Sequence, residues 1–406
     1  MLSPLIGSDR YFTKTNEPIL FKKAHGSTVF DQHNNDYTDF VLGLGPVILG
    51  HSDPEFIERL TQQLSNGLSF PGFADVHSEL SDVYESEYNA HKVVSLFKTS
   101  SEAVTAAMRC CMLETNRKKI IRCGFLGWHD SQIAQTPSWH EWPNSNKRRE
   151  IRFEEGMRGV EDSQAVFNWI DGELASLEKI LIQHGTTTAA FAIDIYQLAF
   201  MSMDVFSKAV SLCQNYGIKI IFDETKTAGR TRAGGFINTD TIPADYIVLG
   251  KAIGNGLPLS VLLGKPENLH IYKNARIGGT HTKETLSANA GIIVADIMKK
   301  REGYSRLPLI GRKIVSSINK SISQSNTTEL LSAVSLLDDT LFDIRFSDTM
   351  VNNFSARENL KRELIAQGVF MLQGHNSFVC LAHESLDFDL LEDKFCNALQ
   401  SWNRSL

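Results

Sequence analysis

Short apolar runs of the kind that form buried strands alternate in this sequence with longer amphipathic segments. The runs are rich in β-branched residues and cover positions 93–97, 119–123, 189–194, 218–223, 246–249 and 259–263. Helical patterns lie between them, at positions 101–114, 165–184 and 203–216. Nearly continuous apolar strands are typical of sheets covered on both faces, and strand–helix alternation is typical of parallel sheets. The pattern therefore predicts an α/β fold with a mainly parallel mixed sheet and helices on both faces.

The two ends of the chain differ from this central region. Two short strands are predicted near the start, at 19–22 and 37–41, and the last hundred residues mix helices with strands such as 336–345 and 369–372. We expect a large domain over residues 51–295 and a smaller α+β domain that combines residues 1–50 with residues 296–406. Ligands of open α/β sheets bind beyond the carboxyl ends of the strands, so the chemistry is expected at that edge.

Composition places the chain among ordinary soluble globular proteins. Apolar residues make up 42% and charged residues 22% of the 406 residues. The formal net charge is −6, so the basic excess that nucleic-acid binding requires is missing. The sequence shows neither a membrane-spanning apolar run nor a signal-peptide pattern. Its six cysteines form no C-x-x-C pair, so we expect free thiols, no metal site and a cytoplasmic location.

A lysine set among glycines follows the run at 246–249. Lys251 opens the segment Lys-Ala-Ile-Gly-Asn-Gly and is itself preceded by glycine. Glycines allow close approach of backbone or ligand, and a desolvated lysine loses its proton and forms Schiff bases. A solvated surface lysine is the alternative interpretation. Lys226 is the rival nucleophile, but the glycine pattern favours Lys251.

Polar residues also follow two other predicted strands. Asp223 and Glu224 end the run at 218–223, where a carboxylate holds a cationic group or caps a helix. Ser100 and Ser101 lie between a predicted strand and a predicted helix. Hydroxyls and free N–H groups at a helix start form either a phosphate cradle or a simple N-cap, and the two roles are compatible.

Two further loops carry candidate ligands. Trp128 and His129 follow the strand at 119–123, where an aromatic ring either stacks on a planar ligand or belongs to the core. Thr280 lies in the loop Gly-Gly-Thr-His-Thr before a predicted helix. That threonine either binds a phosphate or caps the helix.

Together these segments resemble the class III aminotransferases, which are pyridoxal-phosphate-dependent transferases of fold type I. The resemblance extends from about residue 8 to residue 393. Within the family, the segments 17–51 and 378–383 are most similar to glutamate-1-semialdehyde aminomutases. The resemblance implies pyridoxal 5'-phosphate as the cofactor and a homodimer with shared active sites.

The resemblance also assigns roles around the cofactor. It implies that Lys251 forms the Schiff base and carries protons, and that Asp223 pairs with the pyridine nitrogen. Ser100 and Ser101 match the phosphate-binding turn. Thr225 stands where the family has a Val or Ile behind the ring.

Three more cofactor contacts follow from the same resemblance. Trp128 stands where the family stacks an aromatic side chain on the ring, and His129 follows it. Thr280 matches a threonine that reaches the phosphate bound by the neighbouring subunit. This last role is the one that implies the homodimer.

The substrate side departs from the family pattern. Lys226 replaces a Gln or Met, Asp130 replaces a small glycine, and Asp194-Ile195 replaces a Glu-Pro pair. We therefore expect Lys226 and Asp130 to contact a polar substrate. Arg10 aligns with the carboxylate-binding arginine of the aminomutase, and it is either a bidentate clamp for the amino donor or an exposed residue near the terminus.

The function predicted from these features is amino transfer. The amino group moves from a donor amine or amino acid to a polar aldehyde or ketone, such as a sugar-like acceptor. An aminomutase or racemase that acts on a single amino compound is the alternative. A chain that keeps the fold but serves as a binding or regulatory protein is a third interpretation.

Overall fold

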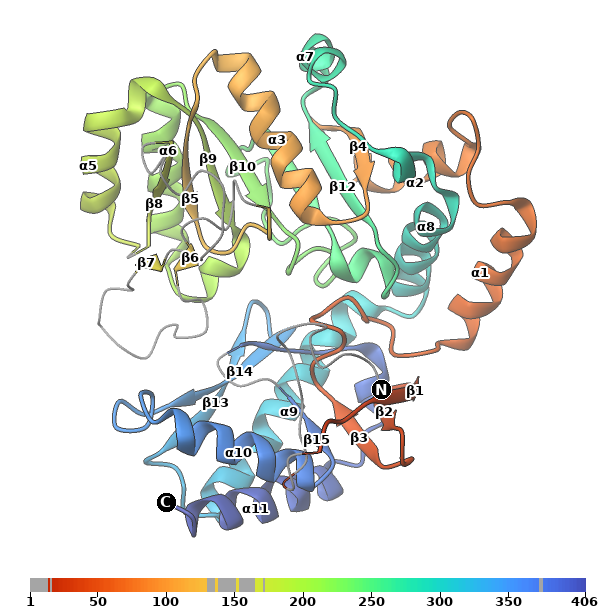
Figure 1. Cartoon of the computed structure of the whole chain (residues 1–406), viewed down its shortest axis with the longest axis vertical. Coiled ribbons are helices and arrows are strands. Elements are labelled where there is room, and N and C mark those ends of the chain that lie inside the picture. The colour runs from red at the N-terminus through yellow and green to blue at the C-terminus, as the bar shows by residue number, and fades with distance from the viewer. Residues whose placement is uncertain are drawn as a thin grey trace. The chain divides into compact units, whose positions relative to one another are not determined.

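The computed structural model describes residues 14, 17–129, 136–137, 151–152, 165–170, 172–371 and 375–406. It divides the chain into two compact units (Figure 1). The large unit comprises Gly45–Ile48 and Pro54–Arg306. The small unit comprises the described residues up to Leu44, together with Leu49–Asp53 and Leu307–Leu406. The predicted limits of the large domain, residues 51 and 295, and of the small domain around it stay predictions.

A seven-stranded sheet forms the centre of the large unit. In spatial order its strands are β4 (Lys92–Phe97), β12 (Ser260–Gly264), β11 (Tyr246–Leu249), β10 (Lys219–Asp223), β9 (Thr188–Asp194), β5 (Lys119–Cys123) and β8 (Val166–Asn168). The strands from β11 to β8 pair in parallel, whereas β12 runs antiparallel to both of its neighbours. The predicted mainly parallel mixed sheet is confirmed, and each of the six predicted strands lies within one residue of its observed ends.

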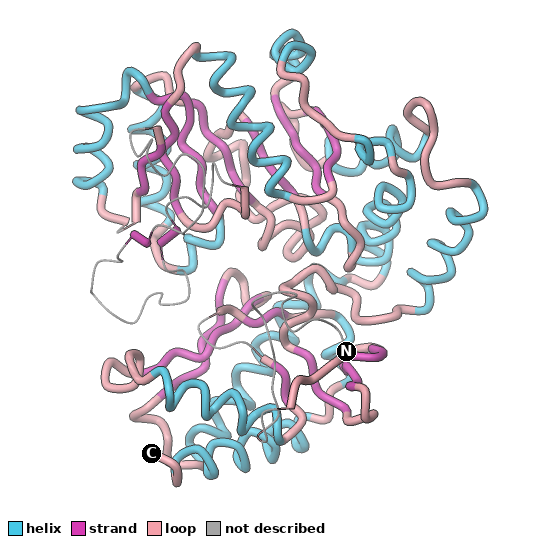
Figure 2. Tube along the Cα trace, in the orientation of Figure 1, coloured by secondary structure: helices cyan, strands magenta, loops and turns pink. Residues whose placement is uncertain are grey.

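Helices cover both faces of this sheet (Figure 2). Those of the large unit are α1 (Pro54–Asn66), α2 (Asp75–Glu85), α3 (Ser100–Thr115), α5 (Leu174–His184), α6 (Met203–Asn215), α7 (Leu269–Asn274) and α8 (Thr285–Lys300). Side chains of β9 alternate between two apolar clusters, because successive residues of a strand point to opposite faces. Ala190 and Ala192 pack in the cluster that contains α3 residues, and Phe191 and Ile193 pack in the cluster that contains α5 and α6 residues.

One predicted helix of this region was too long. The expected helix at 165–184 is confirmed only from Leu174 to His184, because residues Val166–Asn168 form β8 beside β5. The left-handed backbone of Gly172, with φ of +67°, separates strand from helix. The short strands β6 (Thr136–Pro137) and β7 (Ile151–Arg152) pair with each other.

The described residues of the small unit form two small sheets, which pack with three α-helices. One sheet contains β1 (Phe21–His25), β2 (Thr28–Asp31), β3 (Asp36–Asp39) and β15 (Val369–Phe370), and the other contains β13 (Leu331–Leu336), β14 (Leu341–Phe346) and β16 (Ser377–Phe378). The helices are α9 (Gly303–Gln324), α10 (Phe354–Ala366) and α11 (Phe388–Asn403). The single strand expected at 336–345 is wrong. Residues 337–339 all have positive φ and form the turn of the β13–β14 hairpin.

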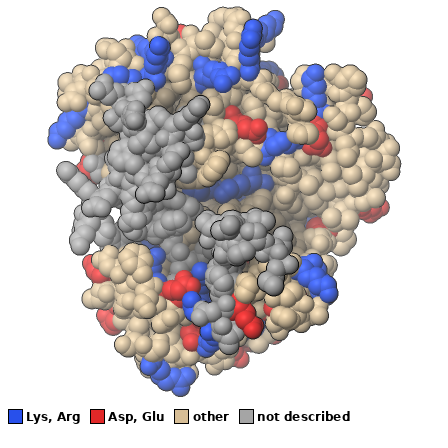
Figure 3. Space-filling view, in the orientation of Figure 1, with Lys and Arg blue, Asp and Glu red and all other residues tan. Residues whose placement is uncertain are grey.

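Two general predictions can be checked on the described residues. All six cysteines are free thiols, as expected. No helix among the described residues is both long and apolar enough to cross a bilayer. On the face in Figure 3, the described Lys and Arg side chains are interspersed with Asp and Glu rather than gathered in one basic stripe.

Candidate active site

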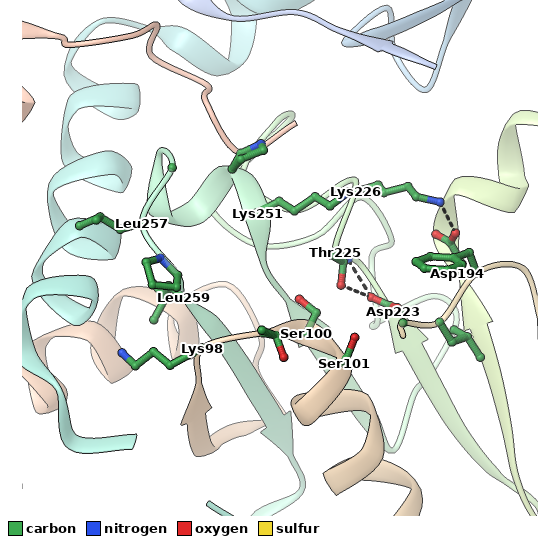
Figure 4. A pocket seen from close by; sticks show the side chains of 17 residues that line it. Lys98, Ser100, Ser101, Asp194, Asp223, Thr225, Lys226, Lys251, Leu257 and Leu259 are labelled. Atoms are coloured by element: carbon green, nitrogen blue, oxygen red, sulfur yellow. Dashed lines mark hydrogen bonds and ion pairs between the residues drawn. The ribbon is translucent and has the colours of Figure 1, made fainter. Parts of the chain in front are cut away.

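A cavity of about 320 Å³ lies at the carboxyl edge of the large sheet (Figure 4). Its walls come from the last residues of β9 and β10, from residues that follow β4, β5, β10 and β11, and from residues that precede β12, with Pro46 beside them. This is the edge at which the sequence placed the chemistry. Lys251, Asp223, Thr225, Lys226, Ser100 and Ser101 all line the cavity.

Asp223 is the last residue of β10 and is buried, with 4% of its surface exposed. Thr225 donates to the Asp223 Oδ1 atom twice, through its backbone N–H at 2.9 Å and through its hydroxyl. Oδ2 accepts no hydrogen bond from any residue that the structure describes. Burial raises the pKa of Asp223 to about 7, and the charge of Asp194 adds to this increase. The bonds from Thr225 and the charge of Lys226 act in the opposite direction.

Lys226 does not extend as a free cation into the cavity. Its Nζ lies 2.7 Å from Oδ2 of Asp194, and both side chains are almost fully buried. The ammonium also lies 4.7 Å from the centre of the Tyr196 ring and 5.7 Å from that of Phe125. A substrate-binding role for Lys226 therefore stays a prediction, because the charge on which it depends is compensated within the protein.

Lys251 is the first residue of the short helical turn η4 (Lys251–Gly254), and it has a φ of +50°. This left-handed conformation is costly for a residue with a side chain, and such residues concentrate at functional sites. Burial lowers the pKa of Lys251 to about 7, and the positive charges of Lys226 and Arg230 contribute to the decrease. A large fraction of the amine is therefore unprotonated, and nucleophilic, at neutral pH.

The turn between β4 and α3 carries the hydroxyl residues. Thr99 caps α3, and the carboxylate of Glu102 accepts the Thr99 backbone N–H at 2.9 Å, which completes a capping box. Ser101 Oγ accepts the backbone N–H of Trp128 at 2.9 Å. Ser100 lies against Gly250, so the phosphate turn and the lysine turn are in direct contact.

The structure does not bring every predicted residue to the cavity. Trp128 is 73% exposed, and neither it nor His129 is among the described lining residues, although Thr105 Oγ1 and His129 Nδ1 lie 2.9 Å apart. Thr280 begins the exposed turn η6 (Thr280–Lys283) and also lies outside the cavity wall. The cofactor roles of these three residues stay predictions. Arg10 and Asp130 lie outside the described residues.

Sequence reasoning missed part of the wall. Asp194, noted above only as a departure on the substrate side, ends β9 directly beside Asp223, and its place at the carboxyl end of a predicted strand was a usable signal. Apart from Lys98 and Thr99, most of the remaining wall is apolar and includes Pro46, Phe125, Leu126, Leu257 and Leu259. Leu259 begins a predicted strand, but the others lie in loops, where apolar residues carry no periodic signal, so nothing in the sequence singled those out.

The arrangement fits pyridoxal 5'-phosphate. A buried carboxylate with an available oxygen, a lysine amine and a pair of serines at the start of a helix are the three contacts that this cofactor needs. Gly250 also permits the close approach of the lysine turn and the serine turn, because a Cβ at this position would come within 2.2 Å of Ser100 Oγ.

Comparisons with known proteins agree with this assignment. The profile of the aminotransferase class-III family matches residues 11–399. The glutamate-1-semialdehyde 2,1-aminomutase of Thermoplasma volcanium is 27% identical over 399 residues, which cover 94% of this chain and 91% of that protein.

Solved structures show the same fold. An omega-transaminase from Sphaerobacter thermophilus superposes with a TM-score of 0.81 at 18% identity, with 96% of this chain and 93% of that chain covered. A transaminase with pyridoxal phosphate bound gives a TM-score of 0.83 at 16% identity, with coverage of 100% and 96%. The chain therefore belongs to the class III aminotransferase family of pyridoxal-phosphate enzymes.

Proposed function

We propose that this protein is an aminotransferase that moves an amino group from a donor amine or amino acid to a carbonyl acceptor. The observation that carries the proposal is that Lys251 and Asp223 line the same cavity as Ser100 and Ser101. When bound, pyridoxal phosphate supplies an aldehyde for covalent attachment and a ring that withdraws electrons from the substrate Cα.

The protein's own residues then have separate tasks. Lys251 Nζ takes the Cα proton and returns it, and a pKa of about 7 suits an amine that must both accept and donate protons. Asp223 holds the proton of the ring nitrogen through Oδ2. Ser100 and Ser101 bind the phosphate with the first N–H groups of α3. Leu257 and Leu259 help to exclude water from the cavity.

A homodimer with shared sites is part of the proposal. Exposed apolar side chains lie in the loop that contains Leu68, Phe70 and Phe73. Their loop is tied to the chain around η6, since Ser69 pairs with Glu284 in a β-bridge and the Lys283 ammonium lies 5.3 Å from the Phe73 ring centre. A second copy that covers this apolar loop is the arrangement that the predicted role of Thr280, at the phosphate bound by the partner, requires.

The finer description of the acceptor stays a prediction. A polar, sugar-like acceptor was expected from Thr225, Lys226 and Asp130. However, Thr225 donates to Asp223 and Lys226 pairs with Asp194, so these two polar groups have partners within the protein. A cytoplasmic location likewise stays a prediction.

A single-substrate aminomutase or racemase is the second candidate. The observation that favours it is the similarity to proteins named glutamate-1-semialdehyde 2,1-aminomutase. Both candidates use the same lysine and carboxylate, so the wall geometry does not distinguish them.

The test begins with purified protein and pyridoxal phosphate. We expect a visible absorption band, and borohydride reduction followed by peptide mapping should place the label on Lys251. Lys251→Ala should abolish the label, and a label on Lys226 would overturn the assignment. Candidate amines are then added without an acceptor. Loss of the band with release of a carbonyl product supports transfer, whereas turnover of one amino compound into its isomer supports the mutase or racemase.

A further inference from the structure

Two buried carboxylates lie side by side at the carboxyl edge of the large sheet. Asp194 and Asp223 are Cα partners in the parallel ladder between β9 and β10, and they expose 1% and 4% of their surface. Neighbouring strands are about 4.8 Å apart. Two such neighbouring carboxylates away from water oppose each other's charge, and the charge of Asp194 raises the pKa of Asp223. The pair therefore needs a compensating cation.

Lys226 provides that cation. Its ammonium is 2.7 Å from Asp194 Oδ2, and the two side chains expose only 6% and 2% of their surface. The rings of Tyr196 and Phe125 flank the ammonium and favour a positive charge there. A substrate that recruited Lys226 would have to break this pair and leave the Asp194 carboxylate buried without its cation.

The neighbouring Thr225 completes the arrangement around Asp223. Its N–H and hydroxyl both donate to Oδ1, which fixes the carboxylate plane. The other charged groups that influence this region are Lys251 and Arg230, and the Arg230 guanidinium is held by the carbonyl oxygens of Lys226 and Gly45. The positive and negative groups thus form one buried network around the cavity.

We propose that Lys226 is a positioning residue for the cofactor rather than a ligand of the substrate: its ammonium neutralises Asp194, so that Asp223 is the anion presented to the ring nitrogen. This inference rests on the proposed function, because it assumes that Asp223 faces that nitrogen. The proposal gives the Lys226–Asp194 ion pair a role in keeping Asp223 negatively charged, and the sequence around Lys226 does not by itself suggest that role. The charge of Lys226 lowers the pKa of Asp223, in the direction that the proposal requires.

The test compares two cofactors on each variant. One is pyridoxal phosphate, and the other is its 1-deaza analogue, in which a C–H group replaces the ring nitrogen. Equilibrium dialysis gives the two dissociation constants, and their ratio reports the contact between Asp223 and the nitrogen. At pH 7.5 we expect the wild type to bind pyridoxal phosphate about tenfold more tightly than the analogue. This factor corresponds to an interaction between Asp223 and the ring nitrogen that shifts a pKa by one unit.

Lys226→Met should reduce this preference by about tenfold, because Asp223 then gains a proton at a higher pH. The double variant with Asp194→Asn and Lys226→Met removes both charges, and it should restore the preference to within about threefold of the wild type. Asp194→Asn alone should leave the preference for pyridoxal phosphate over the analogue unchanged or increase it. If Lys226→Met does not fold, a folded double variant with a preference near that of the wild type supports neutralisation of Asp194 by Lys226, and a preference about tenfold lower contradicts it.

A matched control is Lys98→Met. Lys98 also lines the cavity and is paired with a carboxylate, that of Glu284, at 2.6 Å. This variant should change both dissociation constants by the same factor and leave their ratio unaltered.

Three other results would contradict the proposal, and each points to a different cause. If Lys226→Met weakens both cofactors equally, its role is only structural and the proposal is wrong. An unchanged ratio with a higher KM for the acceptor would return Lys226 to the substrate side. If the wild type itself does not discriminate between the two cofactors, the proposed role of Asp223 fails first.

Discussion

A side chain at Gly250 would collide with Ser100, because a Cβ built on Gly250 lies 2.2 Å from Ser100 Oγ. The two residues belong to the lysine turn after β11 and the serine turn after β4. The contact packs these two turns closely against each other. It also makes the geometry of the cavity sensitive to a single methyl group.

Gly250→Ala is therefore expected to destabilise the apoprotein by about 2 kcal/mol through overpacking. Adding Ser100→Ala removes the colliding oxygen, since Ser100 Cβ is 3.6 Å from the Cβ position at residue 250, and should recover most of the loss. Thermal melting of the two single variants and the double variant measures both effects. Additive losses in the double variant would contradict the contact.

The Lys251 amine should lose its proton near neutral pH and become reactive toward acylation there. With a pKa of about 7, its neutral fraction rises from about 10% at pH 6 to about 90% at pH 8 and then levels off. Trace acetylation of the apoprotein with acetic anhydride, followed by peptide mapping, gives the rate at Lys251 against an added N-acetyl-lysine standard. Reactivity that still increases tenfold per pH unit between 8 and 10 would mean that burial does not lower this pKa.

Because the backbone at Lys251 is left-handed, replacing this residue by glycine should affect stability differently from replacing it by alanine. Lys251→Gly should be more stable than Lys251→Ala by about 1 kcal/mol, because only residues with a Cβ are penalised at a φ of +50°. Both variants lack the amine, so the comparison isolates the backbone. At the next residue the order should reverse, with Ala252→Gly less stable than wild type. Thermal melting of the apoproteins provides the measurement.

Gly235 should tolerate no side chain, because a Cβ there would lie 2.5 Å from Cδ of Glu224. The Glu224 carboxylate cannot retreat, since it accepts the backbone N–H groups of Phe236 at 3.0 Å and Ile237 at 2.9 Å. We expect Gly235→Ala to cost about 2–3 kcal/mol of stability. Gly254→Ala is the control and should cost less than about 1 kcal/mol, because the nearest atom to its Cβ position is Leu259 Cβ at 3.4 Å. Equal melting temperatures for the two variants would disprove the crowding.

Local signals predicted most of the large sheet and the main anchors of the cavity. Apolar runs located the strands to within one residue, and the glycines around Lys251 marked a turn that does line the cavity. The helix expected from residue 165 was wrong at its start, because strand pairing with β5 outweighed the local helical pattern.

Long-range pairing explains what the sequence did not reveal. The partner of Lys226 depends on the register between β9 and β10, which brings Asp194 beside Asp223. No spacing along the chain encodes a contact between residues 32 positions apart. The position of Trp128 depends similarly on a hydrogen bond to Ser101, 27 residues away.

The antiparallel direction of β12 has a consequence for how this cavity can change. Because β12 returns from the edge at which β11 ends, one short connection carries the Lys251 amine at its start and the Leu257–Leu259 wall at its end. Lengthening or shortening that connection would shift the nucleophile and part of the wall together. Variation in substrate preference is therefore more easily accommodated in the loop after β5, which borders the same cavity at residues 125–127 without carrying the lysine.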